Sequence, residues 1–73
     1  MHSEEHIRNN MKSFNRAKSN LTQIIVLATM QDIISHQEFD YILDEIETAT
    51  NSYDLDEIYQ AECFEIHSMI TDA

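Results

Sequence analysis

The chain contains no glycine and no proline, and it has a single cysteine among its 73 residues. Phosphate-binding loops, dinucleotide-binding turns and EF-hand calcium loops all need glycine, because only glycine adopts their backbone conformations at little cost. One cysteine cannot form an internal disulfide, which is the common way to stabilise a small secreted domain. These absences exclude the best-known nucleotide and calcium motifs and favour an intracellular protein.

Long apolar runs are missing as well. The longest run, residues 24–28, is far shorter than the roughly 20 residues that a bilayer-spanning helix needs. The first six residues are polar and acidic, which is unlike a secretory signal peptide. We therefore expect a cytoplasmic protein that has no membrane-spanning segment.

Basic residues are few and unevenly placed. All four lie in the first 18 residues, which carry a formal charge of +2, whereas the remaining 55 residues carry −12 and contain no lysine or arginine. Such an excess of one sign keeps a protein soluble but strains its compact state by self-repulsion. The acids either form an ordinary solvated surface or are arranged to meet a basic surface on another molecule.

Apolar residues recur at helical spacing, which predicts an all-α fold in a single domain, residues 1–73. Ser3 is the expected N-cap of a long first helix that runs to about Asp32. A break near Asn20 is the alternative, and we favour the unbroken helix. Its apolar stripe consists of Ile7, Met11, Phe14, Leu21, Ile25 and Ala28.

Two shorter helices are predicted after the first. Ser35 and Glu38 have the spacing of a capping box and open the second helix, whose stripe is Phe39, Ile42, Leu43, Ile46 and Ala49. Residues 50–53 interrupt the pattern, and Asp54 is the expected cap of the third helix. The apolar stripe of this third helix is Leu55, Ile58, Tyr59, Cys63, Ile66, Met69 and Ile70.

The segment at residues 24–30 is apolar nearly all round, which indicates that it is enclosed on every side. The second and third helices could clasp it from both sides. We favour a second copy of the chain, because a domain this small buries little core alone and a homodimeric helical bundle would enlarge it. The predicted dimer interface is Leu21, Ile24, Ile25, Leu27, Ala28 and Met30.

Nothing in the sequence indicates catalysis or a cofactor. Cys63 falls on the apolar stripe, where thiols are inert. His67 lies four residues on, but a Cys–His pair would lack a third orienting group. His2 and His6 could share a helix face, yet two histidines make a weak metal site. We therefore expect no enzyme, no catalytic residue, no metal and no cofactor.

Direct nucleic-acid binding is not expected either. Arg8, Lys12 and Arg16 recur at four-residue spacing and could follow a row of phosphates. Three charges are few, and the acidic remainder of the chain would repel a duplex at long range.

The acidic rows of the second and third helices are the most informative feature. Carboxylates four residues apart with no intervening base repel one another, so a sequence selected for stability alone should interleave lysines. On rigid helices they can instead imitate the phosphates of a nucleic acid and steer a cationic protein into contact. The predicted contact residues are Asp40, Asp44, Glu45, Glu47, Asp54, Asp56 and Glu57, with Tyr41 and Phe64 as exposed aromatic anchors.

The sequence thus predicts a non-enzymatic acidic protein that binds and occludes a basic partner, one that itself handles nucleic acid. In size and charge it is similar to phage-encoded inhibitors, such as anti-CRISPR and DNA-mimic proteins, and to immunity proteins. The alternative is a helical oligomerisation or regulatory module whose acidic surface only keeps it soluble.

Overall fold

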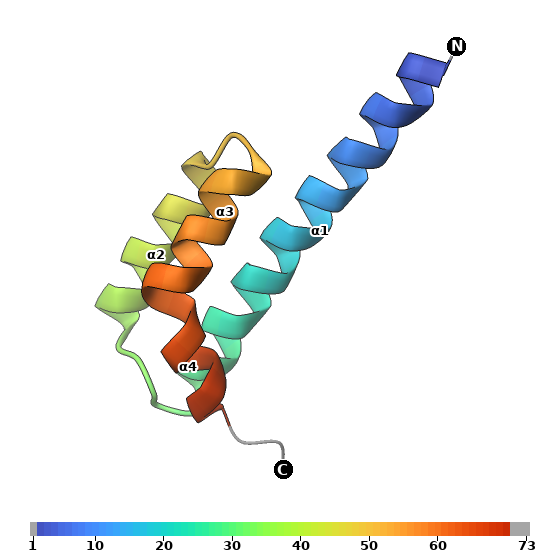
Figure 1. Ribbon diagram of the computed structural model, residues 1–73. Helices are drawn as coiled ribbons and strands as arrows, with labels where there is room; N and C mark the ends of the chain where they lie inside the picture. The colour runs from blue at the N-terminus through green and yellow to red at the C-terminus, as the bar shows by residue number, and fades with distance from the viewer. Residues whose placement is uncertain (1, 71–73) are drawn as a thin grey trace.

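The computed structural model describes the backbone of residues 2–70 and the side chains of residues 13–70. Three helical rods make up this part of the chain, and it contains no strand, so the predicted all-α fold with three rods is confirmed. The third rod runs continuously through three segments (Figure 1), and its middle segment is π-helical. The elements are α1 (His2–Met30), α2 (His36–Thr48), α3 (Ser52–Ile58), η1 (Tyr59–Cys63) and α4 (Phe64–Met69).

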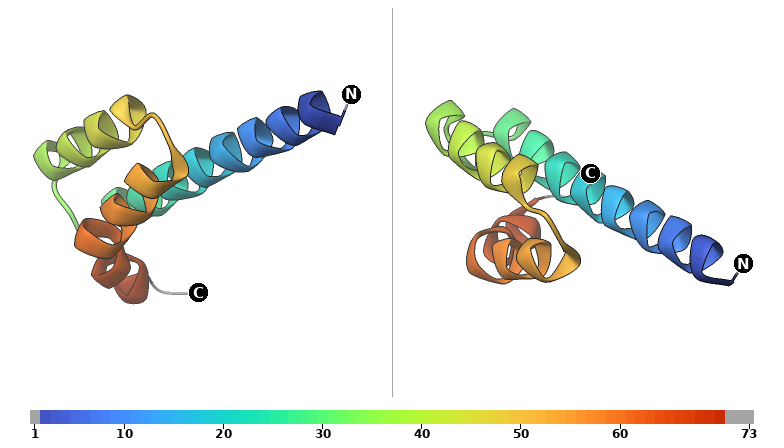
Figure 2. Two further views of the ribbon diagram at one scale, coloured as in Figure 1. Left: turned by 45° about the horizontal axis from the view of Figure 1, so that its top comes forward. Right: turned by 90° about the horizontal axis from the view of Figure 1, so that it is seen from above.

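The three rods pack against one another at the C-terminal half of α1. Each rod contacts the other two, while the N-terminal half of α1 projects beyond them (Figures 1 and 2). The Cα positions extend 47 × 26 × 17 Å, and a helix of 29 residues is about 43 Å long. The long dimension of the molecule is therefore set by α1, which is unbroken at Asn20 as we predicted.

The first helix ends without the glycine that usually closes such a helix. Asp32 takes the left-handed conformation at φ 59°, which aspartate tolerates better than most residues. The N–H of Ile33 then donates to the carbonyl of Ala28 at 2.8 Å, and that of Asp32 donates to Thr29 at 3.1 Å. These two bonds are the Schellman pattern, and they turn the chain toward α2. The helix stops at Met30, two residues earlier than predicted.

Side-chain caps begin the other two rods. Ser35 Oγ accepts from the N–H of Glu38 at 3.2 Å, as the capping box predicted. The prediction that Asp54 caps the third rod is wrong. Asn51 is the cap, because its extended backbone lets its side chain accept from the N–H of Asp54 at 2.9 Å. Asp54 instead accepts from the N–H and hydroxyl of Thr50, both at 3.3 Å.

Removal of this cap is expected to destabilise the fold measurably. Asn51→Ala leaves the N–H of Asp54 without its acceptor, so we expect the free energy of unfolding to fall by about 1 kcal/mol. The measurement is urea unfolding followed by circular dichroism. The control is Asn15→Ala at an exposed site inside α1, where alanine is the better helix former and stability should not fall. Equal losses in both variants would contradict the assignment of the cap.

The core lies where the three rods meet. It contains most of the predicted stripe residues of all three rods, together with Ile34 from the turn after α1. Phe39 and Leu43 pack at its edge, so the predicted stripe of α2 is confirmed. The side chains of Ile7 and Met11 lie outside the described residues. The buried residues are Leu21, Ile25, Ala28, Ile34, Ile42, Ile46, Leu55, Ile58, Cys63 and Ile66.

The π-helical segment corrects the predicted stripe of the third rod. Cys63 comes five positions after Ile58, which would leave the two residues about 140° apart on an α-helix. The N–H of Phe64 donates to the carbonyl of Tyr59, five residues back, and this wider turn lets Cys63 reach full burial beside Ile58. The stripe is thereby centred on Cys63 and Ile66. Met69, about 120° from Cys63 around α4, is 55% exposed rather than buried as predicted.

Candidate functional site: two grooves beside the third rod

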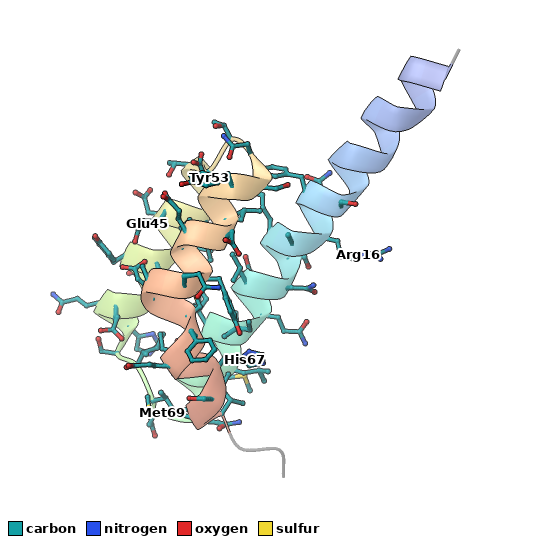
Figure 3. All side chains as sticks on the ribbon, in the orientation of Figure 1. Arg16, Glu45, Tyr53, His67 and Met69 are labelled. Atoms are coloured by element: carbon teal, nitrogen blue, oxygen red, sulfur yellow. The ribbon has the colours of Figure 1, made fainter. Side chains whose placement is uncertain are left out.

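An acidic groove of about 730 Å³ lies between α2 and the third rod. Five carboxylates line it, one from α2 and four from α3 and η1, and none of its lining residues is basic. Figure 3 labels Glu45 on α2 and Tyr53 near the start of α3, which belong to its two sides. The residues of this acidic groove are Glu45, Thr48, Ala49, Tyr53, Asp54, Asp56, Glu57, Ile58, Gln60, Ala61 and Glu62.

The local sequence of α3 explains why acids reach this groove. Leu55 and Ile58 are buried in the core, so the intervening Asp56 and Glu57 are exposed. Asp54 is half-buried and holds the turn before α3 through Thr50. Of the sequence-predicted contact residues, the groove thus brings together Glu45, Asp54, Asp56 and Glu57, and Asp54 also has a structural role.

The other predicted contact residues lie elsewhere. Asp40, Asp44 and Glu47 are exposed on α2 but do not line the acidic groove. Tyr41 is exposed to 62% on the same helix. The predicted residues therefore do not form one surface, because Phe64 lies on the opposite side of the third rod, in the groove formed with α1.

Lys18 meets α2 outside the acidic groove. Its Nζ donates to the backbone carbonyl of Glu47 at 3.2 Å and lies 5.4 Å from the centroid of the Phe14 ring. The positive charge of Lys18 is thus used to join α1 to the end of α2. It does not neutralise the carboxylates that line the groove, which remain available to a positive charge from outside.

The carboxyl groups of Glu45 and Glu62 interact with each other in the acidic groove. Glu45 Oε1 and Glu62 Oε2 are buried, and while both groups are ionised neither oxygen has a hydrogen-bond donor among the described residues. The pKa of Glu62 is raised to about 7, first by burial, then by its hydrogen bond with Glu45 and by the charges of Glu45 and Glu38. A carboxylate only accepts, whereas a protonated carboxyl also donates. A proton on Glu62 therefore lets the two groups bond to each other.

Sequence reasoning missed Glu62 and treated Glu45 as a free surface charge. The two residues lie on different rods, so only the packing of α2 against the third rod brings them together. The sequence did contain one indication of the π-helical segment near Glu62. The apolar residues Ile58 and Cys63 are five positions apart, which matches the i→i+5 hydrogen bonds of a π-helix.

Tyr53 is a second residue that sequence reasoning missed. It is 69% exposed and lines the acidic groove. Its pKa is raised, mainly by the charge of Glu57 and a hydrogen bond to it, and further by Asp56 and Asp54. The signal in the sequence was an aromatic residue beside acids and off the stripe of Leu55 and Ile58.

The environment of the Cys63 thiol does not favour the reactive thiolate form. Cys63 is fully buried, as predicted, and its pKa is raised to about 11 by burial and by the charges of Glu62 and Glu45. His67 Nδ1 lies 3.2 Å from Tyr59 Oη, so the partner of His67 is a tyrosine hydroxyl. Among the described residues, no three His, Cys, Asp or Glu side chains are grouped to hold a metal ion. The side chains of His2 and His6 lie outside these residues.

An uncharged groove of about 680 Å³ lies between α1 and the end of the third rod. Tyr59 and Phe64 meet there edge to face, with ring centroids 6.1 Å apart. A smaller hollow continues from it toward Asp56. The residues of this uncharged groove are Asn20, Gln23, Ile24, Leu27, Tyr59, Phe64, His67, Ser68 and Ile70.

The predicted dimer residues divide between this groove and the core. Ile24 and Leu27 line the uncharged groove, and Met30 is 74% exposed. Leu21, Ile25 and Ala28 are buried in the core of their own chain, because α2 and the third rod cover that side of α1. In this fold Ile25 and Ala28 have no exposed surface and Leu21 has only 6%, so little of these three side chains is left for a second copy.

No helix in the described part of the chain is long and apolar enough to cross a membrane. No protein-family model, curated protein or solved structure matches this chain. The function is therefore inferred from the two grooves themselves.

Proposed function

We propose that this chain is a non-enzymatic, cytoplasmic protein that binds a basic partner protein at the acidic groove and thereby covers the partner's nucleic-acid-binding surface. The observation that carries the proposal is the gathering of five carboxylates around one groove that has no basic lining residue. DNA-mimic inhibitors, anti-CRISPR proteins of phages and immunity proteins would act in this general way.

The groove offers a cationic segment two kinds of contact. Asp56 and Glu57 are exposed carboxylates on a helix, and they would accept charge-assisted hydrogen bonds from arginine or lysine. Tyr53 presents an exposed ring beside them, over which a guanidinium could stack. The negative field of the surrounding acids would also raise the rate of association with a cationic protein.

The first test is binding of a fluorescein-labelled octa-arginine peptide, measured by fluorescence anisotropy. The double variant Asp56→Asn/Glu57→Gln is expected to weaken binding about tenfold or more, since each lost charge-assisted contact contributes on the order of 1 kcal/mol. The matched control, Asp40→Asn/Asp44→Asn, removes the same charge from α2 outside the groove and should weaken binding only a few-fold. Binding should also fall steeply between ~50 mM and ~500 mM salt.

Occlusion is tested by competition with DNA. The wild-type chain should release the octa-arginine peptide from a labelled DNA duplex, and the groove variant should release much less at the same concentration. If both double variants bind and compete equally, the groove is not the binding site. The acids would then serve only as a solubilising surface, as in the oligomerisation-module alternative.

A further inference from the structure

We infer that the uncharged groove between α1 and the third rod holds a second copy of this chain, so that a homodimer forms while the two acidic grooves stay exposed. The inference does not rest on the proposed function, because it concerns the opposite side of the third rod. It replaces the dimer surface expected from the sequence with one that combines residues of α1, η1 and α4.

Charge limits where two copies can meet. Each copy carries a formal charge of −10, so contact between acidic surfaces would cost several charge repulsions. None of the nine residues that line the uncharged groove is Asp, Glu, Lys or Arg. Most exposed acids lie on α2 and α3. Asp56 lines the adjoining smaller hollow and Glu65 follows Phe64 on α4, but neither lines the uncharged groove itself. The uncharged groove is therefore the surface on which two identical acidic chains can approach at least cost.

Exposed apolar side chains give this contact its driving force. Leu27 and Phe64 line the groove, and these residues are 36% and 57% exposed. Met30, three positions after Leu27, and Val26, four positions before Met30, are also exposed and extend this apolar surface along α1 by their helical spacing. In a two-fold contact the same surface is used by both copies. Phe64 of each copy would then cover apolar surface of the other, and buried aromatic residues of this kind dominate binding energies.

Other occupants fit the groove less well. The N-terminal half of α1 continues away from the groove as one unbroken helix (Figure 1), so it cannot cover the groove of its own chain. A basic partner would be drawn to the acidic groove on the other side of the third rod. A second copy presents this same groove, so a two-fold contact would match one neutral, partly apolar surface with another.

The test is sedimentation equilibrium of the full chain at ~50 mM and ~500 mM salt. We expect a dimer whose dissociation constant is below about 100 µM and falls as salt rises, because salt screens the repulsion between the copies. Gln23→Glu places a charge of the same sign in the interface of both copies, and it should weaken the dimer about tenfold or more. Gln37→Glu makes the same nearly isosteric change at an exposed site of α2 and should have almost no effect.

A second pair of variants distinguishes loss of the dimer from loss of the fold. Phe64→Glu is expected to give a monomer, whereas Tyr41→Glu, at a similarly exposed aromatic residue outside both grooves, should leave the dimer intact. Circular dichroism should show unchanged helix content in all four variants. A monomeric wild type at both salt concentrations would overturn the inference, as would equal weakening by the groove variants and their controls.

The two proposals fail separately. Gln23→Glu should leave octa-arginine binding unchanged, because it lies outside the acidic groove. Loss of the dimer with retained peptide binding therefore supports the assignment of different surfaces to the two contacts. If Gln23→Glu weakened peptide binding as strongly as the acidic-groove variant does, this separation would be wrong.

Discussion

Ile25→Ala is expected to lower the free energy of unfolding by about 2–5 kcal/mol, the largest effect of any change considered for this chain. Ile25 is fully buried on α1 and belongs to the core where α1 meets the two other rods, together with Ile42 and Ile46. The substitution removes apolar atoms and leaves a cavity that neighbouring helices fill only in part. Since small domains have only about 5–15 kcal/mol of stability in total, much of the folded population could be lost at elevated temperature.

The measurement for Ile25→Ala is urea unfolding at a protein concentration well below the dissociation constant of the dimer, because dimerisation would add to the apparent stability. This also keeps the control position, which adjoins the proposed dimer contact, free of that effect. The control is Val26→Ala, the next residue of the same helix, which is 37% exposed. There we expect a loss below about 1 kcal/mol. Equal losses at the two positions would show that α1 does not present the buried side described here.

Glu62→Gln is expected to raise stability at pH 8 and to remove part of its pH dependence. The pKa of Glu62 is raised from 4.5 to about 7 in the folded chain, so the folded state binds a proton that the unfolded state lacks between these values. The contribution of protonated Glu62 to the free energy of unfolding is therefore fully present below about pH 4.5 and is lost as the pH rises through about 7. The side chain is partly exposed to solvent, so we expect a loss on the order of 1–2 kcal/mol across that range.

Glu62→Gln separates the pH dependence caused by Glu62 from the general repulsion among the acidic residues. Glutamine keeps an N–H donor for Glu45 at every pH, so Glu62→Gln should match the wild type at pH 4.5 and exceed it at pH 8. Glu65→Gln, an equivalent change at an exposed site of α4, controls for the loss of one charge. Parallel pH–stability curves for the wild type and Glu62→Gln, measured by urea unfolding, would refute the shared proton between Glu45 and Glu62.

Octa-arginine binding should show a related but separate pH dependence. Ionisation of Glu62 as the pH rises through about 7 adds a negative charge to the acidic groove, so the peptide should bind more tightly at pH 8 than at pH 6. The difference should be smaller in Glu62→Gln, which has no charge to gain at this position. An unchanged difference would mean that Glu62 does not contribute to the binding surface.

The helices and the first turn of α2 could be read from the sequence because they depend on residues within a few positions of one another. The predicted N-cap Ser3 is wrong, since α1 already includes His2. Ser35 and Glu38 form their cap across three residues, and the apolar spacing of α2 needs only its own helical period. The third rod was harder even locally. Asn51 and Asp54 are both good caps, and the backbone conformation of Asn51 decides between them. The π-turn at Tyr59–Cys63 then shifts the stripe that a regular helix would have.

The composition of the site was also largely determined by the sequence, since the acids of α2 and α3 and the exposed positions of Tyr41 and Phe64 follow from helical phase. Their grouping was decided only by the tertiary structure. The third rod packs against both α1 and α2, so that Glu45 meets Glu62, and Phe64 faces α1 instead of joining Tyr41. Packing also buried Leu21, Ile25 and Ala28 within the chain. Periodicity states which side of a helix is apolar, but only contact between distant segments determines which neighbour covers that side.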